Sequence, residues 1–241
     1  MRSLLPFAFG ALALAGCVDA FVAPSPNAAL PPLPPAATPA ATQQRAVAAV
    51  KAAGGTVTPA APDPDHPVTA VDFHGARVTA DVLDALKEFP KLRELNLYHT
   101  AVADADLERV AALKGLQTLN LCATRVTDAG LPTLQGLPVL RSLYLNDTAV
   151  DDAGARTLAG FPSLQDLDLC GARVTDAGLE ALKDLRGLQK LSLGGGAITD
   201  RGMTSVAKVR GLHVLMLTRT GVTDAGVRDV QQALPQLQII R

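Results

Sequence analysis

Aromatic side chains and net charge are both scarce in this sequence, and each scarcity excludes a class of partner. The 241 residues include no tryptophan and two tyrosines, too few for the aromatic platforms on which single-stranded nucleic acid stacks. The formal net charge is −1, whereas nucleic-acid-binding proteins normally need a basic face. We therefore expect no nucleic-acid partner and a hydrophobic core built from aliphatic side chains.

The apolar run at the N-terminus is short. Leu4 to Ala15 contains about a dozen apolar residues, whereas a membrane-spanning helix needs about 20. The run follows the positive charge of Arg2 and ends in Leu14-Ala15-Gly16-Cys17, an order typical of a secretory signal. These last four residues resemble the lipobox of bacterial lipoproteins. The resemblance implies that residues 1–16 are a signal peptide and that the Cys17 thiol carries a lipid.

This resemblance also implies a location. A lipid on Cys17 would anchor the chain to a membrane of the bacterial cell envelope. Val18 stands where the enteric sorting rule places an Asp for inner-membrane retention, which slightly favours the outer membrane. Ordinary cleavage near Ala20, with secretion of the chain, is the alternative.

A linker and a cap are expected next. Residues 17–41 are rich in Ala and Pro, which favours extended polyproline geometry and predicts a stalk; a tail without function is the alternative. Residues 42–67 predict an N-terminal cap, because terminal repeats need covers over their hydrophobic ends. We expect a helix from Thr42 through Ala53, with Thr42 as its N-cap, followed by a short strand at 56–58.

A 24-residue unit then repeats seven times. Within the unit, positions 1, 4 and 6 are almost always Leu, position 11 is Val or Ile, and positions 16, 19 and 22 are mostly aliphatic. Alternation at positions 4 and 6 predicts a short strand, and the three-residue spacing from 16 to 22 predicts a short helix. One unit cannot bury its apolar face alone, so the units must stack. They open at Val68, Leu92, Leu116, Leu140, Leu164, Leu188 and Leu212.

This pattern resembles the leucine-rich repeat family over residues 68–241, and most clearly in LQTLNLCATRVTDAGLPTLQGLPV, from Leu116 to Val139. The V-T-D-A-G-L segment is most similar to the cysteine-containing subfamily and related bacterial repeats, although that subfamily usually has a longer period. The resemblance implies an α/β solenoid of seven repeats and a terminal half-repeat, with a curved parallel sheet on the concave side and short helices on the convex side. Position 9 is often Asn in the family. Here Thr hydroxyls can bond the backbone at that turn instead, at Thr100, Thr124, Thr148 and Thr220.

Two further columns run through the repeats. An Asp at position 13 could suggest a calcium site, but each of these residues precedes a predicted helix, where the Asp or the neighbouring Thr can satisfy free N–H groups. The Gly at position 15 predicts close packing of neighbouring coils. The acidic column is Asp104, Asp128, Asp152, Asp176, Asp200 and Asp224.

Catalytic and metal-binding motifs are missing from the sequence. It contains neither His-Glu-x-x-His nor Gly-x-Ser-x-Gly, and Gly194-Gly195-Gly196 is not followed by the Gly-Lys-Ser/Thr of a phosphate-binding loop. Cys122 and Cys170 are two units apart, about 10 Å at the spacing of strands, which is too far for a disulfide. We expect two free thiols, no metal site, no cofactor and no enzymatic activity.

The solvent-facing strand positions are the candidate binding surface. In leucine-rich repeats the non-Leu positions of the strand line the concave face that partners use, and here positions 5, 7 and 8 carry both tyrosines. Tyrosine is favoured in binding hot spots because it combines area with a polar tip. The predicted protein-binding residues are Tyr98, His99, Asn120, Tyr144, Asn146, Asp147, Asp168 and Arg219.

Two functions follow from these patterns. The first is a non-catalytic module, anchored at the envelope, that binds a protein partner through its concave face. The alternative is a structural or spacer protein that acts through stacking or self-association. The chain stops at Leu237 to Arg241 without an amphipathic cap, so we expect an open strand edge there and weak end-to-end self-association. A carbohydrate-binding surface would usually carry more exposed aromatic residues than two tyrosines.

Overall fold

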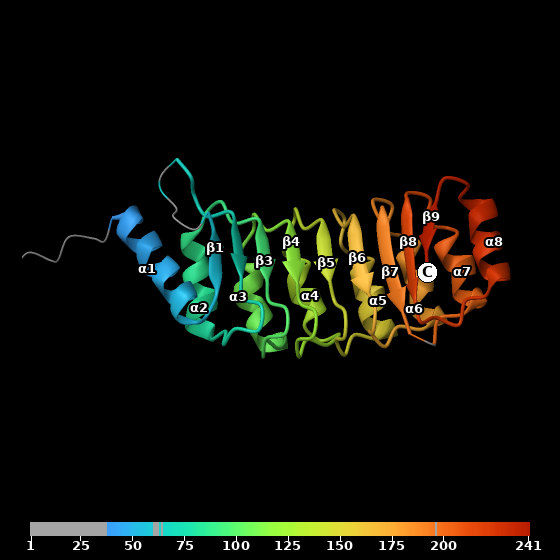
Figure 1. Ribbon diagram of the computed structural model, residues 1–241, viewed down its shortest axis with the longest axis horizontal. Coiled ribbons are helices and arrows are strands. Elements are labelled where there is room, and N and C mark those ends of the chain that lie inside the picture. Colours follow the sequence, from blue (N-terminus) through green and yellow to red (C-terminus); the bar gives the residue numbers. More distant parts are fainter. Residues whose placement is uncertain (1–37, 60–62, 64, 196) are drawn as a thin grey trace, which may run out of the picture. The chain divides into compact units, whose positions relative to one another are not determined.

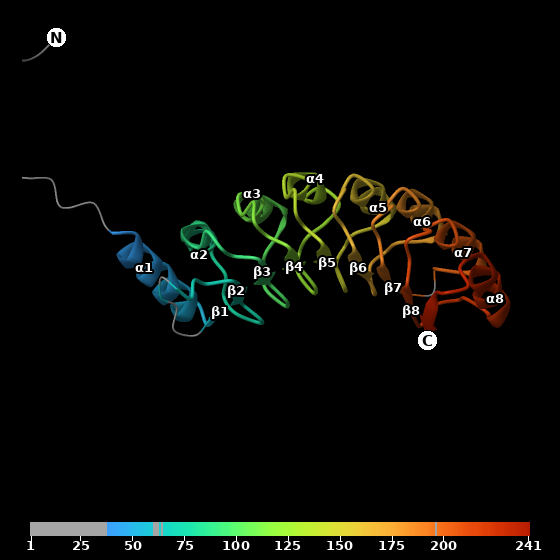
Figure 2. The same ribbon diagram turned by 90° about the horizontal axis from the view of Figure 1, so that it is seen from above.

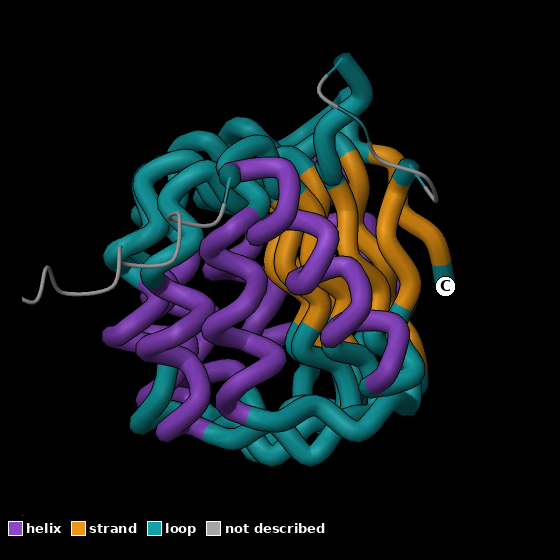
Figure 3. The backbone as a smooth tube through the Cα atoms, turned by 90° about the vertical axis from the view of Figure 1, so that its left-hand side faces the viewer, coloured by secondary structure: helices purple, strands orange, loops and turns teal. Residues whose placement is uncertain are grey.

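The computed structural model describes residues 38–59, 63, 65–195 and 197–241, which form one unit of stacked coils. Each coil places a strand on one side and a helix on the other, so the strands align into one sheet and the helices into a second layer (Figures 1 and 3). The sheet follows the inside of a curve and the helices its outside (Figure 2). The α/β leucine-rich repeat architecture is thereby confirmed. The expected signal peptide, Cys17 and linker residues 17–37 lie outside the described residues.

Within the described residues the sheet has nine strands, which lie side by side in chain order. β1 pairs with β2 in the antiparallel direction, and all later neighbours are parallel and in register at the 24-residue period. The strands are β1 (Thr56–Thr58), β2 (Ala70–Asp72), β3 (Glu94–Asn96), β4 (Thr118–Asn120), β5 (Ser142–Tyr144), β6 (Asp166–Leu169), β7 (Lys190–Gly194), β8 (Val214–Thr218) and β9 (Gln238–Ile240).

The convex helices are short in the first coils and lengthen towards the C-terminus. They are α2 (Ala80–Ala85) with the 3-10 turn η1 (Leu86–Glu88), η2 (Asp104–Asp106) with α3 (Leu107–Ala111), α4 (Leu131–Leu134), α5 (Asp152–Leu158), α6 (Asp176–Leu182), α7 (Asp200–Val206) and α8 (Asp224–Ala233). No helix in the described part of the chain has both the length and the apolar character needed to cross a membrane.

The core lies between the two layers and is aliphatic, as the composition predicts. The Leu residues at positions 1, 4 and 6 of each coil are buried, as Leu116, Leu119 and Leu121 show with 0% exposure. The threonines at position 9 close the turn beneath them, because the hydroxyls of Thr100, Thr124 and Thr148 each donate to the backbone carbonyl three residues earlier. The role predicted for these three threonines is therefore confirmed.

The N-terminal helix begins earlier than the sequence predicts. α1 runs from Pro39 to Ala52, and its N-cap is Thr38, whose hydroxyl accepts from the N–H of Ala41. Thr42, the predicted N-cap, instead lies within the first turn and donates its hydroxyl to the Thr38 carbonyl. Proline suits the first helical position because it lacks the N–H that would have no partner there, so the Ala/Pro-rich composition did not exclude a helix start at Pro39.

The aspartates at position 13 bond across coils, which the sequence did not reveal. Asp176 accepts from both the N–H and the hydroxyl of Thr199 in the following coil, at 2.8 and 2.6 Å. The Thr hydroxyl in turn accepts from the N–H of Arg201 and thereby caps α7. The predicted cap is therefore the Thr, whereas the Asp joins consecutive coils. The same pair of Asp–Thr contacts recurs at Asp104–Thr127, Asp152–Thr175 and Asp200–Thr223.

The glycines at position 15 make room for these carboxylates. A Cβ on Gly202 would overlap the Asp176 carboxylate and lie 2.8 Å from Leu179 Cδ1. A Cβ on Gly130 would lie 2.5 Å from an oxygen of Asp104. The close coil packing predicted for this column is confirmed, and its cause is the aspartate of the preceding coil.

The last coil ends in an exposed strand. β9 pairs in parallel with β8, and its Ile240 is 41% exposed beside Met216 at 40%. Arg241 turns away from the sheet: its guanidinium pairs with the Asp224 carboxylate and donates to the Val222 carbonyl. This guanidinium occupies the side of Asp224 on which a further coil would place its threonine.

Candidate binding surface

The concave face consists of side chains at strand positions 3, 5 and 7, which alternate with the buried positions 4 and 6. Register fixes their neighbours: Asn120 lies opposite Tyr144, and Tyr144 opposite Asp168, on three consecutive strands. Three of the predicted binding residues therefore form one row at about 4.8 Å per strand.

An aromatic cluster stands at the N-terminal half of this face. The His74 and Tyr98 rings meet edge to face with centroids 4.6 Å apart, and the His99 ring lies 6.0 Å from Tyr98. Tyr98 is 37% exposed, one of the few large apolar surfaces that the described residues offer to solvent. Two imidazole rings therefore lie close to the exposed Tyr98 ring. His74 was not among the predicted binding residues.

Tyr144 is the second aromatic residue of the face. Its hydroxyl donates to Asp166 Oδ2 at 3.2 Å. Partial burial raises the pKa of Tyr144, and the Asp166 carboxylate adds to that effect. Burial likewise raises the pKa of Asp166. Asp166 was not among the predicted binding residues, because these come from positions 5, 7 and 8 and Asp166 occupies position 3. Since side chains alternate between the two faces of a strand, position 3 lies on the same face as position 5, where Tyr144 stands.

Several position-5 side chains serve the backbone. The side-chain oxygens of Asn96, Asn120 and Asp168 each accept from the N–H two residues further on, at 2.9–3.0 Å. Asp72 does the same in the first coil. These bonds close the strand ends, so Asn120 and Asp168 offer a partner only their remaining lone pairs and, for Asn120, its amide N–H groups.

The next turn has a left-handed backbone. His99, Ala123, Asp147 and Arg219 have φ between 52° and 55°, and the coils between them use glycine at the same position. A non-glycine residue pays a steric cost there, so position 8 sets the direction of the chain as well as displaying a side chain. A Cβ on Gly171 would overlap the Asp147 carboxylate, so Asp147 lies over the neighbouring turn.

Both described cysteines are free, as predicted. Cys122 is buried, and its thiol donates to Asn146 Oδ1 at 3.2 Å. Burial raises the pKa of Cys122 to about 11 and that of Cys170 to about 12, and Asp168 contributes to both shifts. The thiols therefore stay protonated at neutral pH, and Asn146 has one lone pair fewer for a partner.

A hollow of about 340 Å³ opens on the concave face across β1 to β5. Its polar lining combines carboxylates, amides and hydroxyls, with the Tyr144 ring at one end. Hydrogen-bonding groups and an aromatic surface together suit a polypeptide segment. The lining residues are Thr58, Ala70, Val71, Asp72, Glu94, Leu95, Asn96, Thr118, Asn120 and Tyr144.

The structure brings together only part of the predicted set. Asn120 and Tyr144 line the hollow, and Asp168 adjoins Tyr144. Arg219 occupies the same position as Asp147 but three strands further on, roughly 14 Å at strand spacing. Arg219 therefore does not belong to the surface around the tyrosines.

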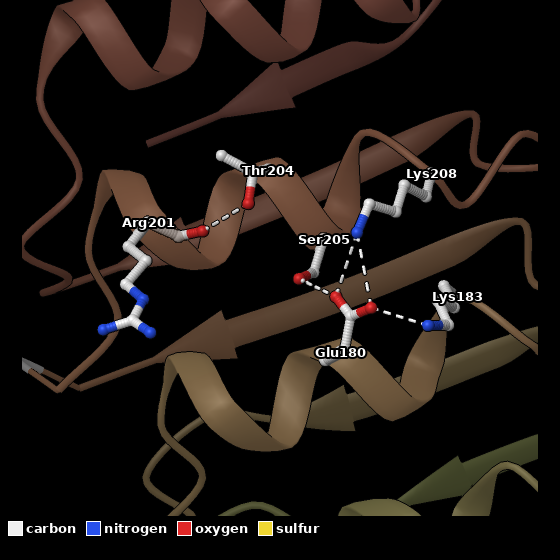
Figure 4. A network of polar contacts seen from close by, with 6 residues as sticks. All are labelled: Glu180, Lys183, Arg201, Thr204, Ser205 and Lys208. Atoms are coloured by element: carbon white, nitrogen blue, oxygen red, sulfur yellow. Dashed lines mark hydrogen bonds and ion pairs between the residues drawn. The ribbon is translucent and has the colours of Figure 1, made fainter.

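A network of polar contacts lies on the opposite, convex side (Figure 4). Glu180 of α6 accepts from Lys183 at 2.6 Å, from the hydroxyl of Ser205 on α7 at 2.6 Å, and from Lys208 at 3.1 Å. These donors lower the pKa of Glu180 to about 2. Because the contacts bridge adjacent coils, we assign the network to coil stacking. A groove of about 550 Å³ beside it is lined by Asp176, Arg201 and Thr204, among others.

Comparisons with known proteins agree with this architecture. Residues 114–174 match the family model "Leucine rich repeat". No curated protein sequence matches the chain. Among solved structures, the LRR protein LIC12759 of Leptospira interrogans is similar with a TM-score of 0.50 and 21% sequence identity. The similarity covers 65% of this chain and 39% of that one, so this chain spans well under half the length of that protein. Together with the stacked strand–helix coils, these matches show that the described part of the chain has the fold of a leucine-rich repeat solenoid.

Proposed function

We propose that this chain is a non-catalytic protein-binding module that holds a protein partner on its concave face. The observation that carries the proposal is the hollow across β1 to β5, with Tyr144 at one end and Tyr98 exposed on the same sheet. Leucine-rich repeat domains generally mediate protein–protein interactions, and the match at residues 114–174 places such repeats at this sheet.

Rigidity of the face supports this proposal. The register of each strand pair fixes the backbone under the hollow, and Asn96 and Asn120 close the strand ends through their side chains. The Tyr98 ring contacts the His74 ring edge to face, and the Tyr144 hydroxyl donates to Asp166. A surface that is already ordered loses little conformational entropy on binding, which favours affinity.

A pull-down from envelope extract tests the proposal. The full chain is compared with the Tyr98→Ala/Tyr144→Ala variant and with a matched control, Val139→Ala, since Val139 is also exposed at 38% but lies between helix and strand, off the concave face. We expect a crosslinked protein with the parent and the control and its loss from the tyrosine variant. Equal capture by all three, with all three folded by circular dichroism, would contradict the proposal.

We further propose that the module is anchored at the bacterial envelope through a lipid on Cys17, with the outer membrane slightly favoured. The support is the Leu14-Ala15-Gly16-Cys17 sequence after a short apolar run. Cells expressing the chain and fed a radiolabelled fatty acid should label the parent, and Cys17→Ser should abolish that label. Label of equal strength in Cys17→Ser would contradict the anchor.

A second candidate function is structural, through weak self-association at the C-terminal edge. Ile240 and Met216 expose apolar surface beside β9, which has a neighbour on one side only. An edge strand of this kind can pair with another chain. Sedimentation that shows a concentration-dependent dimer, removed by Ile240→Lys, would favour this role. A monomer at high concentration would contradict it.

A further inference from the structure

Positive charge gathers along one edge of the solenoid. The residues at repeat positions 23, 24, 1 and 2 precede each strand, and together we call them the strand-start edge. Across all coils these positions carry no Asp or Glu. Their basic residues are Lys91, Arg93, Lys114, Arg141, Arg186 and Arg210.

The backbone places these residues in register. The N–H of Arg93 donates to the Thr69 carbonyl, that of Gln117 to the Arg93 carbonyl, and that of Arg141 to the Gln117 carbonyl. Arg93 and Arg141 therefore lie in one row, two coils apart. In later coils a Cβ on Gly211 would lie 2.9 Å from the Arg186 carbonyl oxygen, so the Arg186 and Arg210 segments touch. The row extends over five strand spacings, about 24 Å.

Arg93, Arg141, Arg186 and Arg210 form no ion pair with a carboxylate in the described part of the chain. Among the described residues, ion pairs use Lys87, Arg109, Lys183, Lys208 and Arg241, with one His66–Asp63 pair. Lys114 donates to the Gly136 carbonyl. The nearest carboxylates along the chain are Glu94, which directly follows Arg93, and Asp184, two residues before Arg186; neither forms any of these pairs.

Attraction to helix C-termini does not explain the position of Arg93 or Arg141. α4 ends at Leu134 and η1 at Glu88, so Arg141 and Arg93 both lie beyond the last helical turn, where the effect of the helix dipole has faded. Their charge is directed to solvent.

The opposite edge is acidic. Repeat positions 8 to 13, which follow each strand, carry eight aspartates and four arginines. Five of these aspartates are those that bond to the following coil, so their place is set by stacking. Charge is thus separated across the width of the sheet, although the whole chain is close to neutral.

We propose that the strand-start edge lies against an anionic lipid surface. Six cations spread along an edge, and not around a pocket, match an extended array of phosphate groups better than one small anion. Lysine and arginine near a membrane are attracted to anionic headgroups. Thr38, the first described residue, lines one groove together with Pro67, Pro90 and Lys91 of this edge, so the described part of the chain begins beside the strand-start edge. The inference rests on the proposed envelope anchor.

Vesicle sedimentation with the full chain tests this orientation. The probes are phosphatidylcholine vesicles with and without phosphatidylglycerol. The edge variant is Arg93→Gln/Arg141→Gln/Arg186→Gln/Arg210→Gln, and the matched control on the opposite edge is Arg77→Gln/Arg125→Gln/Arg173→Gln. Both variants keep the N-terminal segment, so any difference between them reports the edge alone.

We expect the parent and the control to bind the phosphatidylglycerol vesicles more tightly than the neutral ones. Since each basic residue near an anionic bilayer strengthens binding roughly fivefold, the edge variant should lose about a hundredfold or more of that preference. Equal binding of both vesicle types by the parent, an equal loss in both variants, or tighter binding of soluble polyglutamate than of vesicles would overturn the proposal. The edge variant should still capture the protein partner, so failure here is distinct from failure of the concave-face proposal.

Discussion

Single side chains on the concave face differ in how free they are to meet a partner. Tyr98 is exposed beside the His74 ring, whereas Asn120 and Asp168 already accept from the backbone N–H two residues further on. Asn146 is engaged by the Cys122 thiol. The position of a residue in the repeat therefore indicates on which face of the solenoid its side chain lies. The hydrogen bonds that the side chain already makes determine which of its polar atoms remain free to bind a partner.

The thiols give a prediction at this scale. Burial raises the pKa of Cys122 to about 11 and of Cys170 to about 12, and only the thiolate reacts readily with disulfide reagents. In a Cys17→Ser chain at pH 8, we expect the two thiols to react at least about a hundredfold more slowly than free cysteine. Unfolding in urea should restore the ordinary rate. Native labelling at the rate of free cysteine would show that the thiols are not protected.

Glu180 gives a prediction about pH. Its donors Lys183, Ser205 and Lys208 lower its folded pKa to about 2, below the ordinary value of 4.5. A lowered carboxyl pKa stabilises the fold above pH 4.5, and that contribution is lost as pH falls towards 2. The urea midpoint of Glu180→Gln should therefore fall less between pH 5 and about pH 2 than that of the parent. The exposed Glu88→Gln is the control, and an identical pH profile for Glu180→Gln and parent would refute the role.

At the scale of elements, the coils are joined by a bond that repeats with the sequence. The Asp of one coil accepts hydrogen bonds from the Thr of the next coil. The glycine three residues after that Thr leaves space for the carboxylate. Stability thus depends on stacking as well as on the buried leucines, as expected for repeats whose free energy includes nearest-neighbour terms.

Substitutions in this bond have a defined signature. Asp176→Ala removes two hydrogen bonds to a charged group and should cost about 2–4 kcal/mol of unfolding free energy. Gly202→Ala should cost about 1–3 kcal/mol, since its Cβ overlaps the Asp176 carboxylate. Gly136→Ala is the control, with its nearest neighbour 3.3 Å away at the flexible end of Lys114.

The double variant Asp176→Ala/Gly202→Ala tests whether the cost of Gly202→Ala comes from overlap with the Asp176 carboxylate or from a general effect of alanine at this position. With Asp176→Ala in place, much of the overlap at Gly202 disappears, so the second substitution should cost clearly less than it does alone. Equal costs in both backgrounds, measured by urea unfolding, would show that the glycine is needed for another reason.

The elements show what a single sequence can predict. The strands and helices follow from the spacing of leucines, and the 24-residue period fixes the register, since a slip by one residue would turn the leucines outward. The sequence does not predict which residue bonds to Asp176. The repeat pattern indicates that a helix starts there, but not whether the side chain bonds within its own coil or to the next coil. The start of α1 was also misplaced, since Pro39 serves equally well in a polyproline segment and in a first helical turn.

At the scale of the whole molecule, register decides which predicted site residues meet. Tyr144 and Asn120 fall on neighbouring strands and share one hollow, as their equal repeat positions require. Arg219 has an outward position too, but it lies three strand spacings from Asp147. The His74–Tyr98 contact and the Tyr144–Asp166 bond depend on side-chain direction across strands, and composition alone does not reveal it.

The strands lie on the inside of the curve and the helices on its outside (Figure 2). The hollow is lined by strand residues and the Glu180 network joins helices α6 and α7 (Figure 4), so the two faces can be probed independently. The most direct test of concave-face binding places a photo-crosslinking amino acid at Thr118, in the hollow, or at Thr204, on the convex side. Crosslinks to one envelope protein from position 118 and none from position 204 are the predicted result. Crosslinks from position 204 alone, or from neither position, would contradict the account.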